Sequence, residues 1–210
     1  MIHKFTQGSE EWFDYRMGKV TASHIIDIMP GKRVVYRKER DNYMCALAIE
    51  ALTGISQETY KNGSMEHGIE TEPFARSAYE ALNETMIQEV GFIDHHTIDN
   101  TGASPDGLIY DGKKLVGGIE IKCPNTATHI DTLKTGKVKP DYILQMNYCM
   151  VCAEVEWWDF ISFDDRLPDN ARLYVKRIRK DKELCLQIEN EVKKFQNELS
   201  ELVKYLREYK

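Results

Sequence analysis

The stretch SPDGLIYDGKKLVGGIEIKCP, residues 104–124, constrains the fold more than any other part of this chain. Residues 119–123 alternate apolar and charged side chains, and successive side chains of a β-strand point to opposite faces. The alternation predicts a strand that buries one face and places Glu120 and Lys122 together on the other, about 7 Å apart along the strand. Any half-exposed strand can alternate in this way, so the strand alone also fits an ordinary pair of surface charges.

A Pro-Asp-Gly turn that contains Asp106 precedes a second short apolar run, LIY. Pro-Asp-Gly is a common turn for purely conformational reasons. The run that follows should nonetheless pair with residues 119–123, because only a short loop separates the two. Such a hairpin can bring Asp106 beside Glu120, so that two carboxylates and the Lys122 ammonium converge on one spot.

This combination of groups has a chemical use. Two close carboxylates repel each other, and both stay ionised only near a compensating cation. Mg²⁺ takes oxygen ligands, usually one or two carboxylates together with waters and substrate phosphates. Such a metal lowers the pKa of a bound water and stabilises charge on a phosphodiester, and a nearby lysine can orient that water or help to deprotonate it. The pattern therefore predicts a metal-dependent phosphodiesterase centre.

The composition is that of an ordinary globular chain, with 210 residues, 42% of them hydrophobic and 30% charged. This length suits a single domain, residues 1–210. The first residues lack a signal-peptide pattern, and no stretch approaches the ~20 apolar residues of a membrane span. Five cysteines, an odd number, fit a reducing compartment better than a disulfide framework. We therefore expect a cytoplasmic protein with no membrane association.

The net charge of −6 is unusual for a nucleic-acid-binding protein, which typically carries a basic excess. The distribution of charge matters more than its sum, and two local basic groups stand out. They comprise Lys32, Arg33, Arg37, Lys38 and Arg40, and Lys134, Lys137 and Lys139. Each group could contact a nucleic-acid backbone, or could simply form a solvated face.

The remaining pattern predicts a mixed α/β domain in which a central mixed β-sheet is flanked by α-helices. We expect helices after Ser9, from Thr21 or Ser23, before Gly54, at about 65–82 with an interior fault at Pro73, and at 142–153 after a basic loop that begins at residue 131. We expect strands in the runs 86–94, 107–110, 117–123, 156–163 and 174–180, the last at an edge.

The C-terminal segment, about 181–209, has the pattern of one amphipathic helix. Its apolar residues recur at spacings of three and four. They are Leu184, Ile188, Val192, Phe195, Leu199, Leu202 and Leu206. This stripe either packs on the domain itself or forms a helical interface with another subunit.

Several other chemistries lack their motifs. The pair Cys149-x-x-Cys152 has no second CxxC and lies in an apolar helical pattern, so we expect buried packing rather than a redox or zinc site. An iron–sulfur cluster would need four cysteine ligands, and we expect none. The chain contains no Walker A sequence, so we expect no use of ATP.

Pro-Asp followed by Glu-x-Lys on a strand is similar to the core motif of the PD-(D/E)xK nuclease superfamily. The blocks QGSEEWFDYRMGKVTAS, HGIETEPFA, SPDG, GIEIKCP and YILQMNY make the resemblance more specific. In this order and spacing they resemble the lambda-exonuclease family of phage recombination nucleases, the YqaJ-like viral recombinases, over roughly residues 7–160. The resemblance implies a restriction-endonuclease-like core.

The resemblance also implies roles for individual residues. Asp106, Glu120 and the backbone carbonyl of Ile121 would bind the metal, and Lys122 would act on the attacking water. The helical G-x-x-x-E-x-x-A block of the family matches Glu72, which would serve an outer metal shell or a second metal.

Neighbouring residues refine this assignment. Glu70 lies close to Glu72 in sequence but on a different helix face, so it is the less favoured acid. A glutamine near the site matches Gln145. Many relatives carry a second glutamine where this chain has Asn147, which leaves that minor role open.

The N-terminal block of the family anchors a 5′-phosphate, and it maps to Arg16 and Ser23, with Ser104 approaching from the SPDG turn. A guanidinium fork suits a terminal phosphate. The residues alone equally allow a surface salt bridge for Arg16 and a plain helix cap for Ser23. Further DNA contacts are expected from Arg33, Arg37 and Lys137.

The expected activity, by resemblance, is a 5′→3′ exonuclease that uses Mg²⁺ or Mn²⁺. It would degrade one strand of linear double-stranded DNA from 5′-phosphorylated ends to mononucleotides and leave 3′ single-stranded overhangs. Relatives act in phage recombination as homotrimers with a single-strand annealing protein, so a phage or prophage protein in a bacterial host cytoplasm is expected. The alternatives are an endonuclease on the same core and a non-catalytic DNA-end-binding module.

Overall fold

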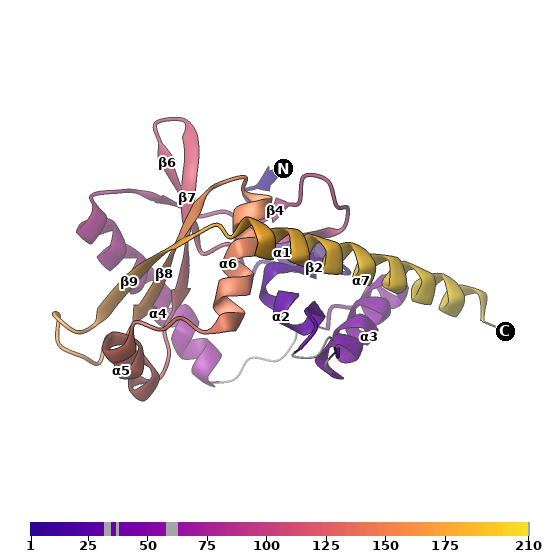
Figure 1. The fold of residues 1–210 in the computed structure, drawn as a ribbon, viewed down its shortest axis with the longest axis horizontal. Coiled ribbons are helices and arrows are strands. Elements are labelled where there is room, and N and C mark those ends of the chain that lie inside the picture. Colours follow the sequence, from indigo (N-terminus) through magenta and orange to yellow (C-terminus); the bar gives the residue numbers. More distant parts are fainter. Residues whose placement is uncertain (32–34, 37, 58–62, 210) are drawn as a thin grey trace.

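The computed structural model describes residues 1–31, 35–36, 38–57 and 63–209 (Figure 1). Within these ranges the chain forms two mixed β-sheets. The smaller sheet has the order β1 (Ile2–His3), β4 (Phe92–Asp94), β5 (Thr101–Ala103), β2 (Val20–Thr21). The larger sheet has the order β3 (Ile87–Gln88), β6 (Gly107–Asp111), β7 (Lys114–Lys122), β8 (Trp157–Phe163), β9 (Leu173–Arg179).

Strand β7 lies in the middle of the larger sheet. It pairs antiparallel with β6 and parallel with β8. The predicted hairpin is therefore present, but its register differs from the prediction, because Leu108, Ile109 and Tyr110 pair with residues 115–118 rather than with residues 119–123. Gly117 and Gly118 are required here, because the rings of Trp157 and Trp158 lie where a Cβ atom on either glycine would be. The central strand of a mixed sheet is thus the strand that carries the alternating charged residues.

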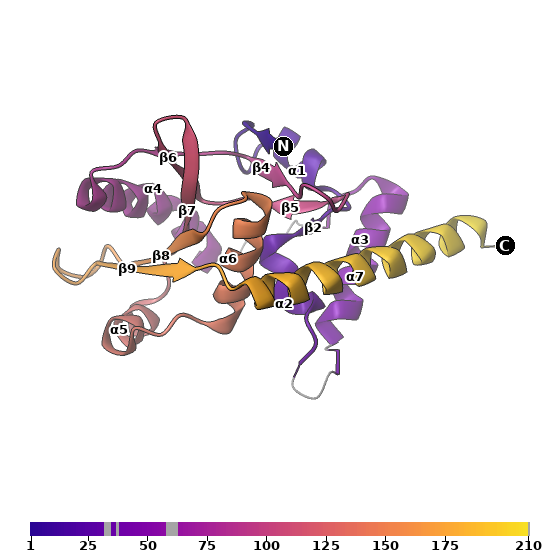
Figure 2. The same ribbon diagram turned by 45° about the horizontal axis from the view of Figure 1, so that its top comes forward.

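Helices cover both faces of β7 and β8 (Figures 1 and 2). On one face, α4 (Gly63–Asn83) packs Ala75 and Tyr79 against the apolar side chains of the strands. On the other, α6 (Pro140–Cys152) packs Met146 and Cys149 into the larger core. Because Ile119 and Ile121 face α4, Glu120 and Lys122 must face α6.

The C-terminal helix α7 (Lys182–Glu208) starts at Asp181, whose side chain accepts a hydrogen bond from the Leu184 N–H. Its buried residues include Ile188, Val192 and Phe195, and it packs against α3 (Lys38–Thr53) and α6 (Figure 2). The apolar stripe therefore packs on the domain itself, which was the first of the two predicted alternatives. The last turns are more exposed, and α7 extends past the body of the molecule (Figure 1).

The predicted helix at about 65–82 is present as α4 and runs through Pro73 without a break. The predicted end of a helix at Gly54 is confirmed, since α3 ends at Thr53. The predicted start of a helix after Ser9 is also confirmed, since Ser9 caps α1 (Glu10–Arg16). Cys149 and Cys152 are buried in α6 as expected.

Three local predictions were wrong. The expected α-helix does not start directly after Thr21 or Ser23. Thr21 ends a short strand β2 and precedes a 3₁₀ turn (Ala22–His24) without a side-chain capping hydrogen bond, and α2 (Ile25–Ile28) follows that turn. The run 86–94 divides between β3 and β4, which belong to different sheets.

The third wrong prediction is the basic loop expected from residue 131. Its first part continues α5 (Thr126–Thr135). Asn125 accepts the Thr128 N–H at the start of this helix and Gly136 ends it at φ 62°, and these two caps override the weak helical preference of the threonines between them.

None of the helices in the described part of the chain is both long and apolar enough to cross a bilayer.

Candidate active site

Strand β7 brings an acid and a base into contact. Lys122 Nζ lies 2.6 Å from Glu120 Oε1, and the Glu120 side chain is 1% exposed whereas that of Lys122 is 29% exposed. A carboxylate this deeply buried is costly unless a cation compensates it. Among the described residues, Lys122 is the partner closest to the Glu120 carboxylate, so the ion pair with Lys122 is its main compensation.

Asp106 is held against the same strand. Its Oδ2 accepts a hydrogen bond from the Ile121 N–H at 2.6 Å. The segment that carries Asp106 joins β5 of the smaller sheet to β6 of the larger one, so this hydrogen bond fixes the crossing between the sheets. The predicted convergence of Asp106, Glu120 and Lys122 is therefore present.

Glu72 approaches from α4. Arg76, one turn later on the same helix, pairs with Glu72 at 2.6 Å and with Glu89 at 3.0 Å. The Glu72 side chain is 32% exposed, whereas Glu70 is exposed. The structure thus separates the two acids as the helical pattern predicted.

Electrostatics couples these groups. Burial raises the pKa of Glu72 to about 7, with a further rise from Asp106 and a partial offset from Arg76. Burial likewise raises the pKa of Glu120 to about 7, although Lys122 lowers it. The pKa of Asp106 is raised by burial against the opposing effect of Lys122. Because burial is the largest cause of all three raised pKa values, a cation bound among these acids would favour their ionised forms.

Lys122 shows the complementary effect. Burial lowers the pKa of Lys122, but Glu120 and Asp106 outweigh burial and hold it above its ordinary value. The ammonium form therefore persists at neutral pH beside the carboxylates.

The donor set fits a hard divalent cation such as Mg²⁺. Within the described ranges, no three or more His, Cys, Asp or Glu side chains form a complete protein cage for a metal. Mg²⁺ does not need one, because it binds through one or two carboxylates and keeps several waters. The hydrogen-bonding capacity left on the buried Glu120 oxygens and the raised acid pKa values both favour such a cation.

Helix α6 supplies the opposite wall. Gln145 is close enough to Glu120 to lower its pKa, although burial and Lys122 have larger effects, so the predicted glutamine lies beside Glu120. The Lys122 Nζ also lies 5.0 Å from the centroid of the Tyr142 ring, and Tyr142 in turn stacks on Phe160. The sequence interpretation missed Tyr142. Its position three residues before Gln145 in a helix was the available signal, because that spacing shares a face.

A second polar group adjoins the first. Arg16 Nη1 and Trp12 Nε1 both donate to Ser104 Oγ, at 2.9 and 3.1 Å, and the guanidinium lies 4.1 Å from the Trp12 ring centroid. Arg16 is buried, which does not fit the surface position considered above. Since Ser104 precedes Asp106 by two residues, this group is continuous with the acidic site. Arg16 and Lys19 also line a cavity of about 120 Å³.

The other predicted DNA-binding residues are less tightly placed. Ser23 is exposed and its Oγ lies 3.2 Å from Thr21 Oγ1. Lys137 is exposed just after α5. Arg33 and Arg37 lie outside the described residues. Arg40 is buried and pairs with Glu198 at 2.8 Å, so it serves the contact between α3 and α7 rather than a nucleic acid.

Known proteins of similar sequence and structure place this geometry in a family. The family model of the YqaJ-like viral recombinase domain matches residues 11–156. The crystal structure of an alkaline exonuclease (LHK-Exo) from Laribacter hongkongensis is 48% identical, with a TM-score of 0.87 over 95% of this chain and 96% of that chain.

Two further solved structures are similar. LHK-Exo in complex with dAMP is 47% identical, again with a TM-score of 0.87 over 95% of this chain and 96% of that one. A phage related exonuclease from Haemophilus somnus 129PT shares the fold at 18% identity, with a TM-score of 0.66 over 90% of this chain and 96% of that one. Among curated proteins none matches. The chain therefore belongs to the family of YqaJ-like viral recombinase domains and has the fold of an alkaline exonuclease.

Proposed function

We propose that this chain is a metal-dependent 5′→3′ exonuclease that degrades one strand of linear double-stranded DNA from 5′-phosphorylated ends. One observation carries the proposal: Glu120 and Lys122 form a buried ion pair on the central strand while Asp106 is bound to the amide between them. This arrangement combines oxygens that can bind a catalytic metal with an ammonium that can offset phosphate charge, and both suit phosphodiester hydrolysis.

In this proposal Asp106, Glu120 and the Ile121 carbonyl hold Mg²⁺, for which Mn²⁺ can substitute. The bound metal would supply Lewis-acid activation of the water and of the scissile phosphate. The Lys122 ammonium donates hydrogen bonds to the water or to a phosphate oxygen and offsets negative charge. Glu120 fixes the position of that ammonium, and the Tyr142 ring limits its movement from the other side.

Glu72 and Gln145 complete the centre from the two covering helices. Glu72 would bind outer-shell waters or a second cation, and Arg76 holds it toward the site from one turn away. Gln145 would orient the Glu120 carboxylate or the water, since its amide already interacts with Glu120. The proposed reaction involves neither ATP nor an iron–sulfur cluster.

We assign recognition of the 5′-phosphate to Arg16, Ser104 and Ser23. The buried guanidinium next to Ser104 supports this assignment, because charge-assisted hydrogen bonds from a fixed fork suit a terminal phosphate. Lys137, and from the sequence alone Arg33 and Arg37, would contact the DNA backbone. The dAMP bound to LHK-Exo supports mononucleotide products.

The biological setting is proposed from the family. The product would be a 3′ single-stranded overhang for phage-type recombination by strand annealing, with a single-strand annealing protein as partner. We propose a homotrimer and a phage or prophage origin, with action in the cytoplasm of a bacterial host.

The test uses duplex DNA in three forms: linear with 5′-phosphates, linear with 5′-hydroxyls, and covalently closed circular. Wild-type protein and the Glu120→Ala variant are each incubated with Mg²⁺ and with EDTA. The proposal expects the wild type alone, with Mg²⁺ alone, to degrade the linear 5′-phosphorylated DNA fastest and to leave the circle intact. Nicking of the circle would establish an endonuclease. Binding of ends by both proteins without degradation would establish a non-catalytic end-binding module.

A further inference from the structure

Lys122 lies at the end of its strand, where the pairing with the neighbouring strand stops. It is the last residue of β7, and its pairing with Ser162 is the final pair of the parallel ladder with β8. Beyond it the chain turns into α5 at Thr126. Since the terminal residue of a strand lacks ladder neighbours on one side, the position of the Lys122 ammonium depends on what holds the turn after it.

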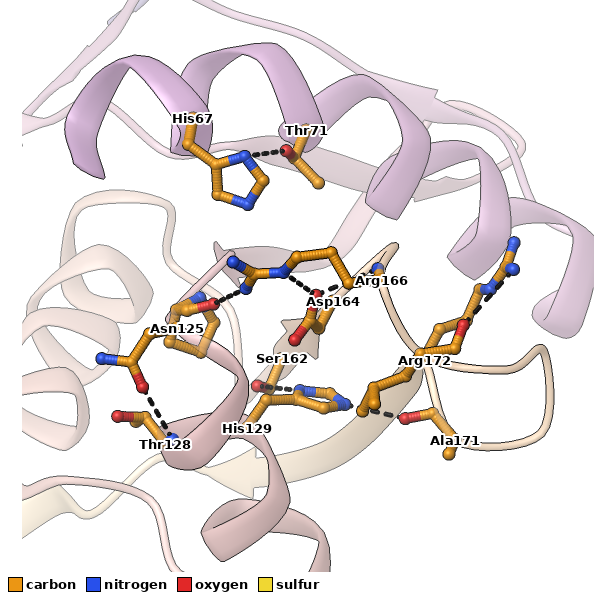
Figure 3. Close-up of polar contacts among 12 residues, drawn as sticks. His67, Thr71, Asn125, Thr128, His129, Ser162, Asp164, Arg166, Ala171 and Arg172 are labelled. Carbon is orange, nitrogen blue, oxygen red and sulfur yellow. Dashed lines mark hydrogen bonds and ion pairs between the residues drawn. The ribbon is translucent and has the colours of Figure 1, made fainter. Parts of the chain in front are cut away.

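An arginine holds that turn. Asp164 directly follows β8, and its side chain is 0% exposed. Its Oδ1 accepts hydrogen bonds from the Arg166 backbone N–H at 3.1 Å and from Arg166 Nε at 2.6 Å. Arg166 Nη2 donates in turn to the Pro124 carbonyl at 3.0 Å. Figure 3 shows the Arg166 side chain extended from Asp164 toward the turn that contains Asn125.

The neighbouring strand β8 is also fixed at its end, by a hydrogen bond to α5. His129 of α5 is fully buried, and its Nε2 lies 2.9 Å from the Ala171 carbonyl, which can only accept. His129 Nδ1 therefore accepts from Ser162 Oγ at 2.7 Å when the ring is neutral (Figure 3). Ser162 is the ladder partner of Lys122, so the end of β8 is a fixed reference to which the end of β7 can be tied.

We propose that Arg166 is a positioning residue for Lys122: by bridging Asp164 and the Pro124 carbonyl it keeps the end of β7 in register with the end of β8. The role of Lys122 in cleavage rests on the proposed function above. The bridge requires a planar fork, because one guanidinium reaches two acceptors at once, whereas a lysine ammonium is a compact charge without that geometry.

The same loop provides a matched control. Arg172 likewise pairs with a nearby aspartate, Asp169, at 2.6 Å, and donates to the Leu167 carbonyl at 3.5 Å. Its side chain is 38% exposed, close to the 47% of Arg166. The hydrogen bonds and ion pairs described for Arg172 stay within its own loop and do not extend to residues 122–125.

The first experiment measures single-turnover cleavage of an end-labelled linear duplex and, separately, the Kd for its end in Ca²⁺. We expect Arg166→Ala to slow cleavage roughly 10- to 100-fold, because a displacement of about 1 Å at the reacting centre has that effect. The Kd should stay within about two-fold of wild type, since the loss is confined to the chemical step. Arg166→Lys should recover little of the rate, because lysine lacks the planar fork, whereas millimolar guanidinium should partly rescue Arg166→Ala. Arg172→Ala should behave as wild type.

The second experiment is independent of activity. Hydrogen–deuterium exchange of the peptide that covers residues 119–126 should be faster in Arg166→Ala than in wild type or Arg172→Ala. If the peptide 119–126 exchanges at the same rate in Arg166→Ala as in Arg172→Ala, the proposal is overturned. A weaker Kd with an unchanged cleavage rate also overturns it, and would make Arg166 a DNA contact. If exchange is faster in Arg166→Ala than in wild type but the wild type degrades no DNA, the proposed function is refuted, while the role of Arg166 in holding the end of β7 against β8 is established.

Discussion

Asp106 accepts a hydrogen bond from the backbone N–H of Ile121, the residue between Glu120 and Lys122, at 2.6 Å. The acid from the turn is therefore bound to the strand itself, and any movement of β7 carries all three charged groups with it. Geometry of this kind preorganises a centre, because the groups need no rearrangement among themselves when a substrate arrives.

The stability of the metal-free protein should decrease as the pH rises from about 4.5 to about 7. The pKa of Glu120 is raised to about 7 in the folded protein, so the folded state binds more protons than the unfolded state in that window and the free energy of unfolding falls with pH. Glu120→Gln should remove about 1–3 kcal/mol of this decrease, and Glu72, whose pKa is also raised to about 7, should contribute to the remainder.

Thermal unfolding in EDTA from pH 4 to pH 9 measures the effect, and Mg²⁺ or Mn²⁺ at pH 8 should restore the stability of the wild type but not that of the variant. A wild type whose stability is flat between pH 4.5 and 7 would contradict the electrostatic picture of the site.

Glu72 and Glu70 form a matched pair on one helix. Glu72→Gln should reduce cleavage at least about 10-fold and raise the metal concentration needed for half-maximal activity. The reason is that the variant removes the negative charge that would hold outer-shell waters or a second cation. Glu70→Gln should change neither, since Glu70 is exposed. Metal titrations of initial cleavage rates compare the two variants. Equal losses in both would show that the assignment of Glu72 over Glu70 is wrong.

Arg16→Ala should reduce the preference for 5′-phosphorylated over 5′-hydroxyl ends by roughly 10- to 100-fold, because a charge-assisted hydrogen bond is lost. Lys137→Ala is the comparison: an exposed lysine should weaken binding of both ends equally and reduce the slope of log Kobs against log salt by about one. Initial rates on the two substrates give the preference. An Arg16→Ala protein that keeps the wild-type preference would remove Arg16 from phosphate recognition.

We expect the ring of Tyr142, and not its hydroxyl, to contribute to the cleavage rate. Tyr142→Ala should lower the cleavage rate about 3- to 30-fold, which is the range of a cation–π contact with a partly buried ammonium. Tyr142→Phe keeps the ring and should stay near wild type. Single-turnover rates at saturating metal test this, and a large loss in Tyr142→Phe would instead assign the phenol a direct part in the reaction.

The core of the site was predictable from sequence because it is local. The period of two in residues 119–123 and the hairpin before them determine where Asp106, Glu120 and Lys122 lie. Glu72 and Gln145 come from helices far along the chain, and only the family resemblance indicated them. Their placement depends on which helix covers which face of the sheet, which no local pattern encodes.

Other features had no sequence signal of their own. Arg166 belongs to a loop, and its partners Asp164 and Pro124 meet only when β7 and β8 pair in parallel. Arg40 resembled its basic neighbours in sequence, yet it is buried against Glu198 of α7. Surface and core arginines look alike until the long-range packing is known.

The parallel pairing of β7 with β8 also decides when the centre can form during synthesis. β6 and β7 are adjacent in the chain, but β8 begins only at Trp157, after α5 and α6 have been made. Non-local pairing is slow because loop closure must precede it. A nascent chain that stops before β8 has an open edge on the strand that bears Glu120 and Lys122, so cleaving capacity arises only after most of the polypeptide has left the ribosome.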